Sequence, residues 1–155
     1  MRILFLDIDG VLNSTSSFVA LGRSTYYEDE NGNTVGTNFS PVSVKLLEKL
    51  CKKFDLKIYV HSTWSKWCDY KWFQSHIDID VEFLETFGYE EKREQRIETG
   101  IRNYKPDDFI ILDDYDLTRF FKEQAVVVDN TNGLDYNSYQ KVCEYFGEET
   151  ELILF

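Results

Sequence analysis

Two carboxylates stand two residues apart at the end of an apolar run near the start of the chain. Residues 3–6 form the run, and Asp7 and Asp9 follow it with Ile8 between them. Because side chains alternate along a strand with a period of two, we expect both carboxylates to leave the sheet edge on the same side. Like charges that close repel each other unless a cation or a shared proton lies between them. The pair therefore predicts a metal-assisted phosphoryl or acyl transfer site.

Two later apolar runs, residues 56–61 and 109–112, also end in polar residues. The polar residues that follow them are Ser62, Thr63, Asp113 and Asp114. If all three runs are parallel strands of one sheet, their polar endings converge at its carboxyl edge, where such folds bind ligands. Four carboxylates at one edge need a counterion, and hard oxygen ligands with an open shell indicate Mg²⁺.

The rest of the chain supplies alternating strands and helices that would hold these endings. Ser40 and Pro41 predict a helix start, and apolar spacing extends that helix to Phe54. We also expect helices over 64–73, 91–104 and 136–146 and a fourth strand over 125–128. This alternation predicts an α/β fold: a three-layer, Rossmann-like parallel sheet in a single domain spanning 1–155. Residues 13–39 look irregular and polar, with Asn31 and Gly32 as a hairpin turn, and predict a flap over the site.

Composition limits the class of protein and its partners. The chain has 155 residues, 43% of them hydrophobic, and no apolar run long enough to span a membrane, so we expect a cytoplasmic protein with no membrane partner. The net charge of −11 and the lack of a basic stripe disfavour binding that depends mainly on nucleic-acid phosphates. We therefore rank a small phosphorylated substrate or nucleotide above a polynucleotide end. The oligomeric state stays open.

The ordered strand endings, Asp-x-Asp-Gly-Val, then a hydroxyl, then Asp-Asp, resemble the haloacid dehalogenase superfamily from residue 1 to about 116. The resemblance implies that Asp7 is a nucleophile that forms an aspartyl-phosphate and that Asp9 is the acid and base. It also implies that the side chains of Asp7 and Asp113 and the backbone carbonyl of Asp9 bind Mg²⁺. Asp114 is an alternative ligand, because adjacent residues point to opposite faces, and Asp116 is a candidate for steadying the ligands.

The same resemblance requires a hydroxyl and a cation to bind the substrate phosphate. Ser62 matches the hydroxyl, with Thr63 as the second choice. Lys105 looks like the usual lysine, but it directly precedes the 109–112 strand and so belongs near the opposite sheet edge. We therefore prefer Arg93, at the start of a helix, with the basic side chains beside it as alternatives. Those alternatives are Lys92 and Arg96.

The second acid, Asp9, favours a phosphatase over a dehalogenase, because phosphate esters need a protonated leaving group and halides do not. The segments 13–39 and 65–92, where relatives insert caps, are shorter than the roughly 40 residues that fold alone, which predicts a capless enzyme. The site also resembles, more weakly, the phosphatase half of polynucleotide kinase. Two rivals stay open: a polynucleotide 3′-phosphatase, and an idle fold kept as a binding module. The sequence shows no evident partner for His61, so we expect it to lie in the core or at the sheet edge.

Overall fold

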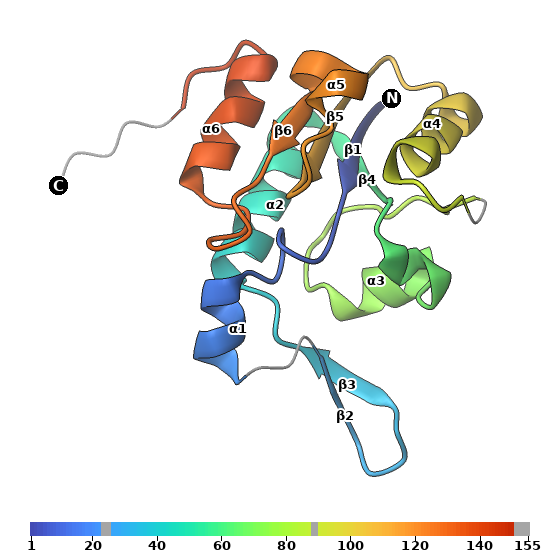
Figure 1. The fold of residues 1–155 in the computed structure, drawn as a ribbon, viewed down its shortest axis with the longest axis vertical. Coiled ribbons are helices and arrows are strands. Elements are labelled where there is room, and N and C mark those ends of the chain that lie inside the picture. Colours follow the sequence, from blue (N-terminus) through green and yellow to red (C-terminus); the bar gives the residue numbers. More distant parts are fainter. Residues whose placement is uncertain (23–25, 88–89, 151–155) are drawn as a thin grey trace, which may run out of the picture.

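The fold is built on a four-stranded sheet whose strands all run parallel. The computed structural model describes residues 1–22, 26–87 and 90–150. The strands lie in the order β4-β1-β5-β6, with β1 at the centre beside β4 and β5 (Figure 1). Their bounds are Arg2–Leu6 for β1, Leu56–Val60 for β4, Asp108–Asp113 for β5 and Ala125–Val127 for β6. The predicted parallel sheet is confirmed.

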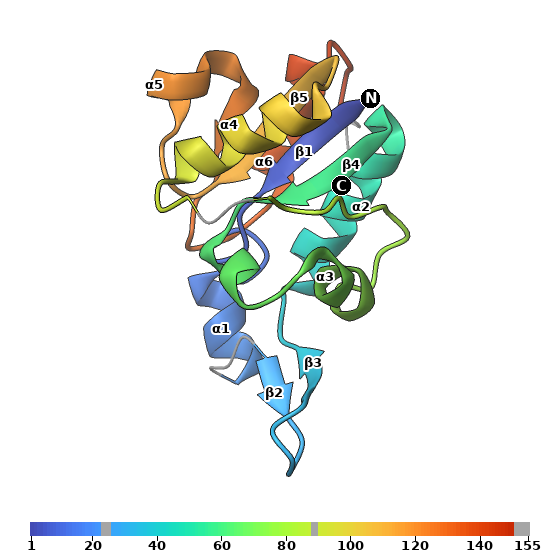
Figure 2. The ribbon, with the colours of Figure 1, turned by 90° about the vertical axis from the view of Figure 1, so that its right-hand side faces the viewer.

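Helices cover both faces of this sheet, which gives the expected three layers (Figure 2). On one face, α2 (Pro41–Phe54) and α6 (Tyr136–Tyr145) pack on even-numbered β1 side chains such as Leu4. On the other, α4 (Arg93–Tyr104) and the short α5 (Thr118–Phe121) pack on odd-numbered ones such as Phe5. This division follows from the period-two alternation of a strand that is buried on both faces.

Helix α2 begins and ends at the predicted residues. Ser40 accepts a hydrogen bond from the Ser43 backbone, and Pro41 occupies the first turn, where its missing N–H costs nothing. Asp55, in the left-handed region at φ 53°, ends the helix. Helix α4 lies within the predicted range, and α6 ends one residue early.

Three elements differ from the sequence predictions. Residues 13–39 are not wholly irregular, because α1 (Thr15–Leu21) begins at a reciprocal cap between Ser14 and Ser17. Its apolar residues are largely exposed, so the sequence has no amphipathic pattern that would predict this helix. The predicted helix over 64–73 is broken into a 3-10 turn, η1 (Thr63–Lys66), and α3 (Tyr70–His76). The turn α5 and the 3-10 turn after it, η2 (Lys122–Gln124), were also not predicted.

The predicted hairpin is present as β2 (Tyr26–Glu28) and β3 (Thr34–Thr37), which pair antiparallel. Asp29 organises its turn by accepting hydrogen bonds of 2.9 Å from the backbones of Asn31 and Asn33. The hairpin projects away from the sheet beyond α1 (Figures 1 and 2). The tail 151–155, whose role the sequence left open, lies outside the described residues. Within the described part of the chain, no helix is both long and apolar enough to cross a bilayer.

Candidate active site

Three neighbouring strands place one polar residue each at the same level of the sheet. Leu6 pairs with Val60 on one side and with Leu112 on the other. The residues that follow these three are Asp7, His61 and Asp113, and all are buried. Alternation turns their side chains toward the face that α4 covers. A buried polar layer therefore replaces the apolar core at the carboxyl edge of the sheet.

Three carboxylates meet in this layer. One oxygen each of Asp7, Asp113 and Asp114 lies within 4.8 Å of the others. The sequence left open which of Asp113 and Asp114 turns inward, and the structure brings both to the group. Asp114 also packs tightly against Gly10, where a Cβ atom would lie 2.6 Å from Asp114 Oδ2 and the backbone has a φ of +82°. Only glycine suits such a position.

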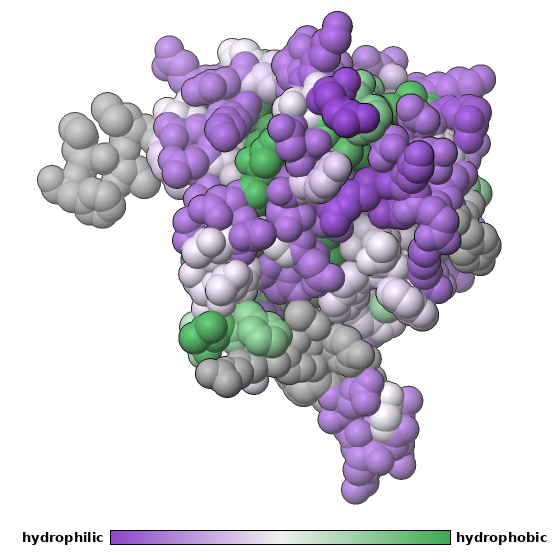
Figure 3. Space-filling view, viewed as in Figure 1, coloured by the Kyte–Doolittle hydropathy of each residue, from purple (hydrophilic) through white to green (hydrophobic). Residues whose placement is uncertain are grey.

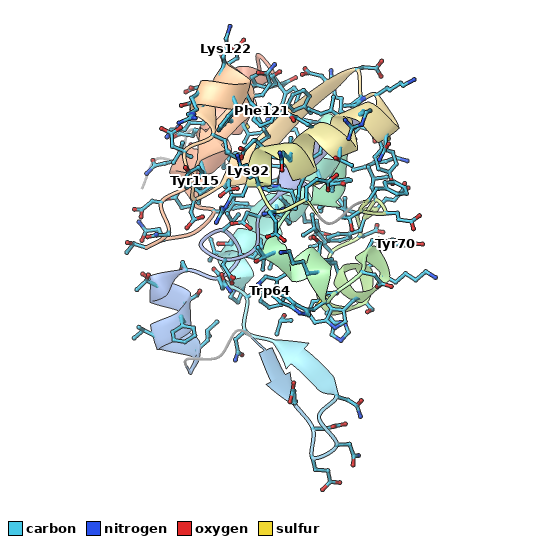
Figure 4. The ribbon with its side chains drawn as sticks, turned by 45° about the vertical axis from the view of Figure 1, so that its right-hand side comes forward. Trp64, Tyr70, Lys92, Tyr115, Phe121 and Lys122 are labelled. Atoms are coloured by element: carbon cyan, nitrogen blue, oxygen red, sulfur yellow. The ribbon has the colours of Figure 1, made fainter. Side chains whose placement is uncertain are left out.

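Arg93, the first residue of α4, lies on these carboxylates. Its Nη1 is 3.1 Å from Asp7 Oδ2 and 3.5 Å from Asp114 Oδ1, and it also donates to Asp113 Oδ1. The guanidinium is 5.4 Å from the ring centre of Tyr115. Figure 4 shows Tyr115 and Lys92 near each other, above Trp64 in that view. The expected placement of the α4 start at the carboxyl edge is therefore seen, and Arg93 is the cation nearest the group.

Burial and neighbouring charges set different proton affinities within the group. Burial and the Asp113 charge raise the pKa of Asp7, although His61, Arg93 and Ser62 act in the opposite direction. Burial also disfavours the charge on Asp113, but the hydrogen bond from His61 and the charge of Arg93 bring its pKa below the usual value. Burial and Asp113 raise the pKa of Asp114. The charge on Asp7 and Asp114 is therefore disfavoured even with Arg93 and His61 beside the group.

His61 has a partner that the sequence analysis did not find. Its Nε2 lies 2.7 Å from Asp113 Oδ2, and the ring is fully buried. The other ring nitrogen, Nδ1, is buried with no hydrogen-bond partner in the described structure. The interaction reaches from β4 across the end of β1 to β5. Aligning the ends of the three predicted strands would have placed both residues in one layer.

The Asp9 carboxylate lies outside the group of three and has its own partners. Oδ1 accepts 2.7 Å from Asn13 Nδ2, and Oδ2 accepts 3.0 Å from Trp64 Nε1. The Gly10 backbone N–H in turn donates to both the backbone carbonyl oxygen and the side-chain Oδ1 of Asn13. Two donors on one exposed carboxylate fix its orientation, so Asp9 is held beside the buried group rather than within it.

The predicted phosphate-binding hydroxyls take different places. Ser62 is buried, lies near enough to Asp7 for its hydroxyl to lower the pKa of that carboxyl, and accepts from the Trp64 backbone at 3.3 Å. Thr63 begins the η1 turn and is exposed. The structure therefore brings Ser62, but not Thr63, to the carboxylate group.

The other predicted residues lie away from the carboxylates. Lys92 is exposed and precedes α4, and Lys105 ends α4 near the opposite edge, as expected. Arg96 is buried and donates to the backbone carbonyls of His61, Glu90 and Glu91, so it supports loops rather than the group. The expectation that Asp116 steadies the ligands is not supported by its position, because its carboxylate accepts from Thr118 and is exposed.

The residues present fit a hard divalent cation. Three carboxylate oxygens converge, the pKa values of Asp7 and Asp114 are raised by burial and by the Asp113 charge, and Asp114 is only partly buried. Oxygen ligands of this kind are what Mg²⁺ prefers. An acid held beside the group, as Asp9 is, adds the proton transfer that hydrolysis of an ester needs.

Comparison with known proteins bears on this arrangement. A family model described as "HAD domain in Swiss Army Knife RNA repair proteins" matches residues 3–138. The match includes every residue of the carboxylate group, Arg93, and the sheet that positions them. Searches of curated proteins and of solved structures gave no match.

Proposed function

Since this chain is a HAD-like phosphatase of the family found in Swiss Army Knife RNA repair proteins, we propose that it hydrolyses phosphate monoesters with Mg²⁺ through an aspartyl-phosphate on Asp7. The observation that carries the proposal is the convergence of Asp7, Asp113 and Asp114 within 4.8 Å beside a separately held Asp9. A binding module would have no need for three carboxylates in a largely buried group, because their repulsion destabilises the fold.

In the first step, an Asp7 oxygen forms a bond to phosphorus while the bond from phosphorus to the leaving oxygen breaks. Asp9 gives its proton to that oxygen, which departs as an alcohol. In the second step, Asp9 takes a proton from water as the water oxygen attacks phosphorus, and Asp7 leaves as a carboxylate. Inorganic phosphate is the product. A positioned acid and base of this kind contributes about 10²- to 10⁴-fold to the rate.

The carboxylates of Asp7, Asp113 and Asp114 would hold Mg²⁺, which would supply charge neutralisation for the phosphoryl oxygens and for the nucleophile. Ser62 lies against Asp7 and is suited to donate to a phosphoryl oxygen. Arg93 now bonds to the carboxylates themselves, so its guanidinium must change partners to bind the phosphate. His61 holds the Asp113 carboxylate in place through its 2.7 Å contact.

We propose the phosphorylated end of an RNA as the substrate, because the family description places these domains in RNA repair proteins. A free nucleotide or small phosphometabolite is the second candidate, favoured by the net charge of −11. The two differ in their salt dependence, since binding to a polynucleotide weakens steeply as salt rises.

Hydrolysis of 4-nitrophenyl phosphate with and without Mg²⁺ tests the reaction. Asp7→Asn should lose about 10³-fold or more in kcat, because the nucleophile is gone. Asp116→Asn is the matched control, since Asp116 lies in the loop after β5 that carries Asp114 but outside the carboxylate group, and it should keep its activity. Equal rates for Asp7→Asn and the unsubstituted protein would overturn the proposed mechanism. Activity that EDTA leaves unchanged would overturn the Mg²⁺ requirement.

A further inference from the structure

A pocket of about 380 Å³ opens beside Asp9, and none of the steps above uses it. Its volume lies at the small end of the roughly 300–1,000 Å³ range of ligand pockets. The residues that line it are Asp9, Gly10, Asn13, Ser14, Thr15, Phe18, Asp114 and Asn130. They come from the end of β1, from α1 and from the loops that follow β5 and β6. The pocket is therefore continuous with the active site.

The chemistry determines what part of a substrate faces this pocket. Asp9 must contact the leaving oxygen to protonate it, and Asp9 and Asp114 are both pocket residues. The phosphoryl group lies toward Asp7 in the proposed reaction, so the rest of the substrate extends from the leaving oxygen past Asp9. The pocket occupies that direction.

The walls are held in place by the backbone. The Thr15 N–H donates to the Asn130 carbonyl at 3.0 Å, which joins the start of α1 to the loop after β6. The neighbouring Ser16 N–H donates to the Thr131 carbonyl at 3.0 Å, and Ser14 caps the helix. These bonds hold the backbone of α1 against the loop after β6, and Phe18 from the helix and Asn130 from the loop both line the pocket.

The lining matches an uncharged aromatic group that also has polar edges. Phe18 lines the pocket with an aromatic ring and is 39% exposed. Figure 3 shows an apolar patch over α1, in green at the lower left. Thr15 and Asn130 are exposed polar residues that offer hydrogen-bonding groups. Asp9 and Asp114 at the inner end would repel a negatively charged group placed inside the pocket itself. A nucleoside has the flat ring, the polar edges and the neutral charge that this lining favours.

We propose that this pocket binds the nucleoside that carries the scissile phosphate, with its base stacked on Phe18 and its polar edge or sugar bonded to Asn130. This inference rests on the proposed phosphatase function and names the part of the substrate that the enzyme recognises. A free mononucleotide and the terminal nucleotide of an RNA both present this group, and the experiment separates them.

The test compares Phe18→Ala with Val19→Ala, its neighbour on α1, which is 64% exposed and does not line the pocket. The substrates are adenosine 3′-monophosphate, an RNA oligonucleotide with a 3′-phosphate, and glycerol phosphate as a small leaving group. Base stacking contributes about 1–3 kcal/mol, so Phe18→Ala should raise KM for both nucleotide substrates by about 5- to 150-fold. Hydrolysis of glycerol phosphate and all rates of Val19→Ala should stay unchanged.

Two further variants separate stacking from bulk. Phe18→Trp should keep the low KM, whereas Phe18→Leu should lose it, because leucine is apolar but has no ring. A higher kcat/KM for the oligonucleotide than for the mononucleotide would assign the pocket to RNA ends, and the reverse order to free nucleotides. If Phe18→Ala and Val19→Ala behave alike with every substrate, the pocket assignment is overturned while the phosphatase function stands.

Ligand binding to the Asp7→Asn variant tests the nucleoside pocket separately from the proposed phosphatase reaction. Calorimetric titration of this variant with adenosine 3′-monophosphate, with and without Phe18→Ala, measures the pocket without turnover. A 5- to 150-fold weaker Kd on loss of the ring would support the nucleoside pocket even if no phosphate ester were hydrolysed. Equal affinity in the two proteins would overturn it.

Discussion

Replacing Arg93 by glutamine should destabilise the metal-free protein and strengthen its binding of Mg²⁺. The guanidinium contacts all three carboxylates that we assign to the metal, so arginine and cation compete for the same oxygens. Glutamine removes the charge and keeps part of the side-chain bulk. The arginine side chain is 36% exposed, whereas Asp7 and Asp113 are 5% and 1% exposed.

These exposed fractions determine how much stability the loss of Arg93 should cost. Removing one partner of a buried ion pair costs about 3–5 kcal/mol, and exposed pairs contribute about 0–1 kcal/mol. The partly exposed Arg93 falls between these cases, so we expect a loss of about 2–3 kcal/mol in the free energy of unfolding in EDTA. For a chain of this length that lowers Tm by about 5–10 °C. If Mg²⁺ no longer displaces an arginine, its Kd should fall by at least about tenfold.

Thermal unfolding in EDTA and in a Mg²⁺ series measures both effects. Mg²⁺ at a hundred times its Kd should return about 2.7 kcal/mol to the variant. The control is Lys92→Gln, which removes one charge from the neighbouring, exposed position and should leave both Tm and Mg²⁺ affinity unchanged. The reasoning is refuted if Arg93→Gln is as stable as Lys92→Gln in EDTA, or if both bind Mg²⁺ with equal affinity.

Three further substitutions test other contacts. Gly100→Ala should lower Tm by about 2–4 °C. A Cβ atom there would lie 2.6 Å from the Phe5 ring, and overpacking that costs about 1–3 kcal/mol exceeds the gain of about 1 kcal/mol in helix propensity. An equal or higher Tm would contradict this. Trp64→Phe removes the 3.0 Å hydrogen bond to Asp9 and should lower kcat by about tenfold or more with Tm nearly unchanged, whereas an unchanged kcat would show that this bond does not position the acid. Hydrogen bonds from two lysines lower the pKa of Glu48 from 4.5 to about 2, so Glu48 contributes stability that is complete above about pH 4.5 and lost as the pH falls toward 2. Glu48→Gln should therefore unfold more easily at pH 7 but not at pH 2, as measured by urea denaturation, and a constant difference across this range would contradict the assignment.

Local patterns predicted much of the fold because they depend on neighbours in the sequence. The cap at Ser40 and the proline after it place the start of α2 correctly, and the apolar runs place the central strands. The same reasoning missed α1, whose exposed apolar residues face no core. Nor does the helical pattern indicate the packing role of Gly100, whose missing Cβ lets α4 approach Phe5.

The sequence by itself determined which strand ends carry carboxylates, and therefore that Asp7 and Asp113 meet at one edge of a parallel sheet. Parallel strands with short polar endings leave few other arrangements. Only the tertiary structure decided the partners of those carboxylates: His61 on Asp113, Arg93 on the whole group, and Trp64 on Asp9. These contacts join residues 20 to 86 positions apart. They depend on strand register, helix placement and side-chain direction, which no local pattern of residues encodes.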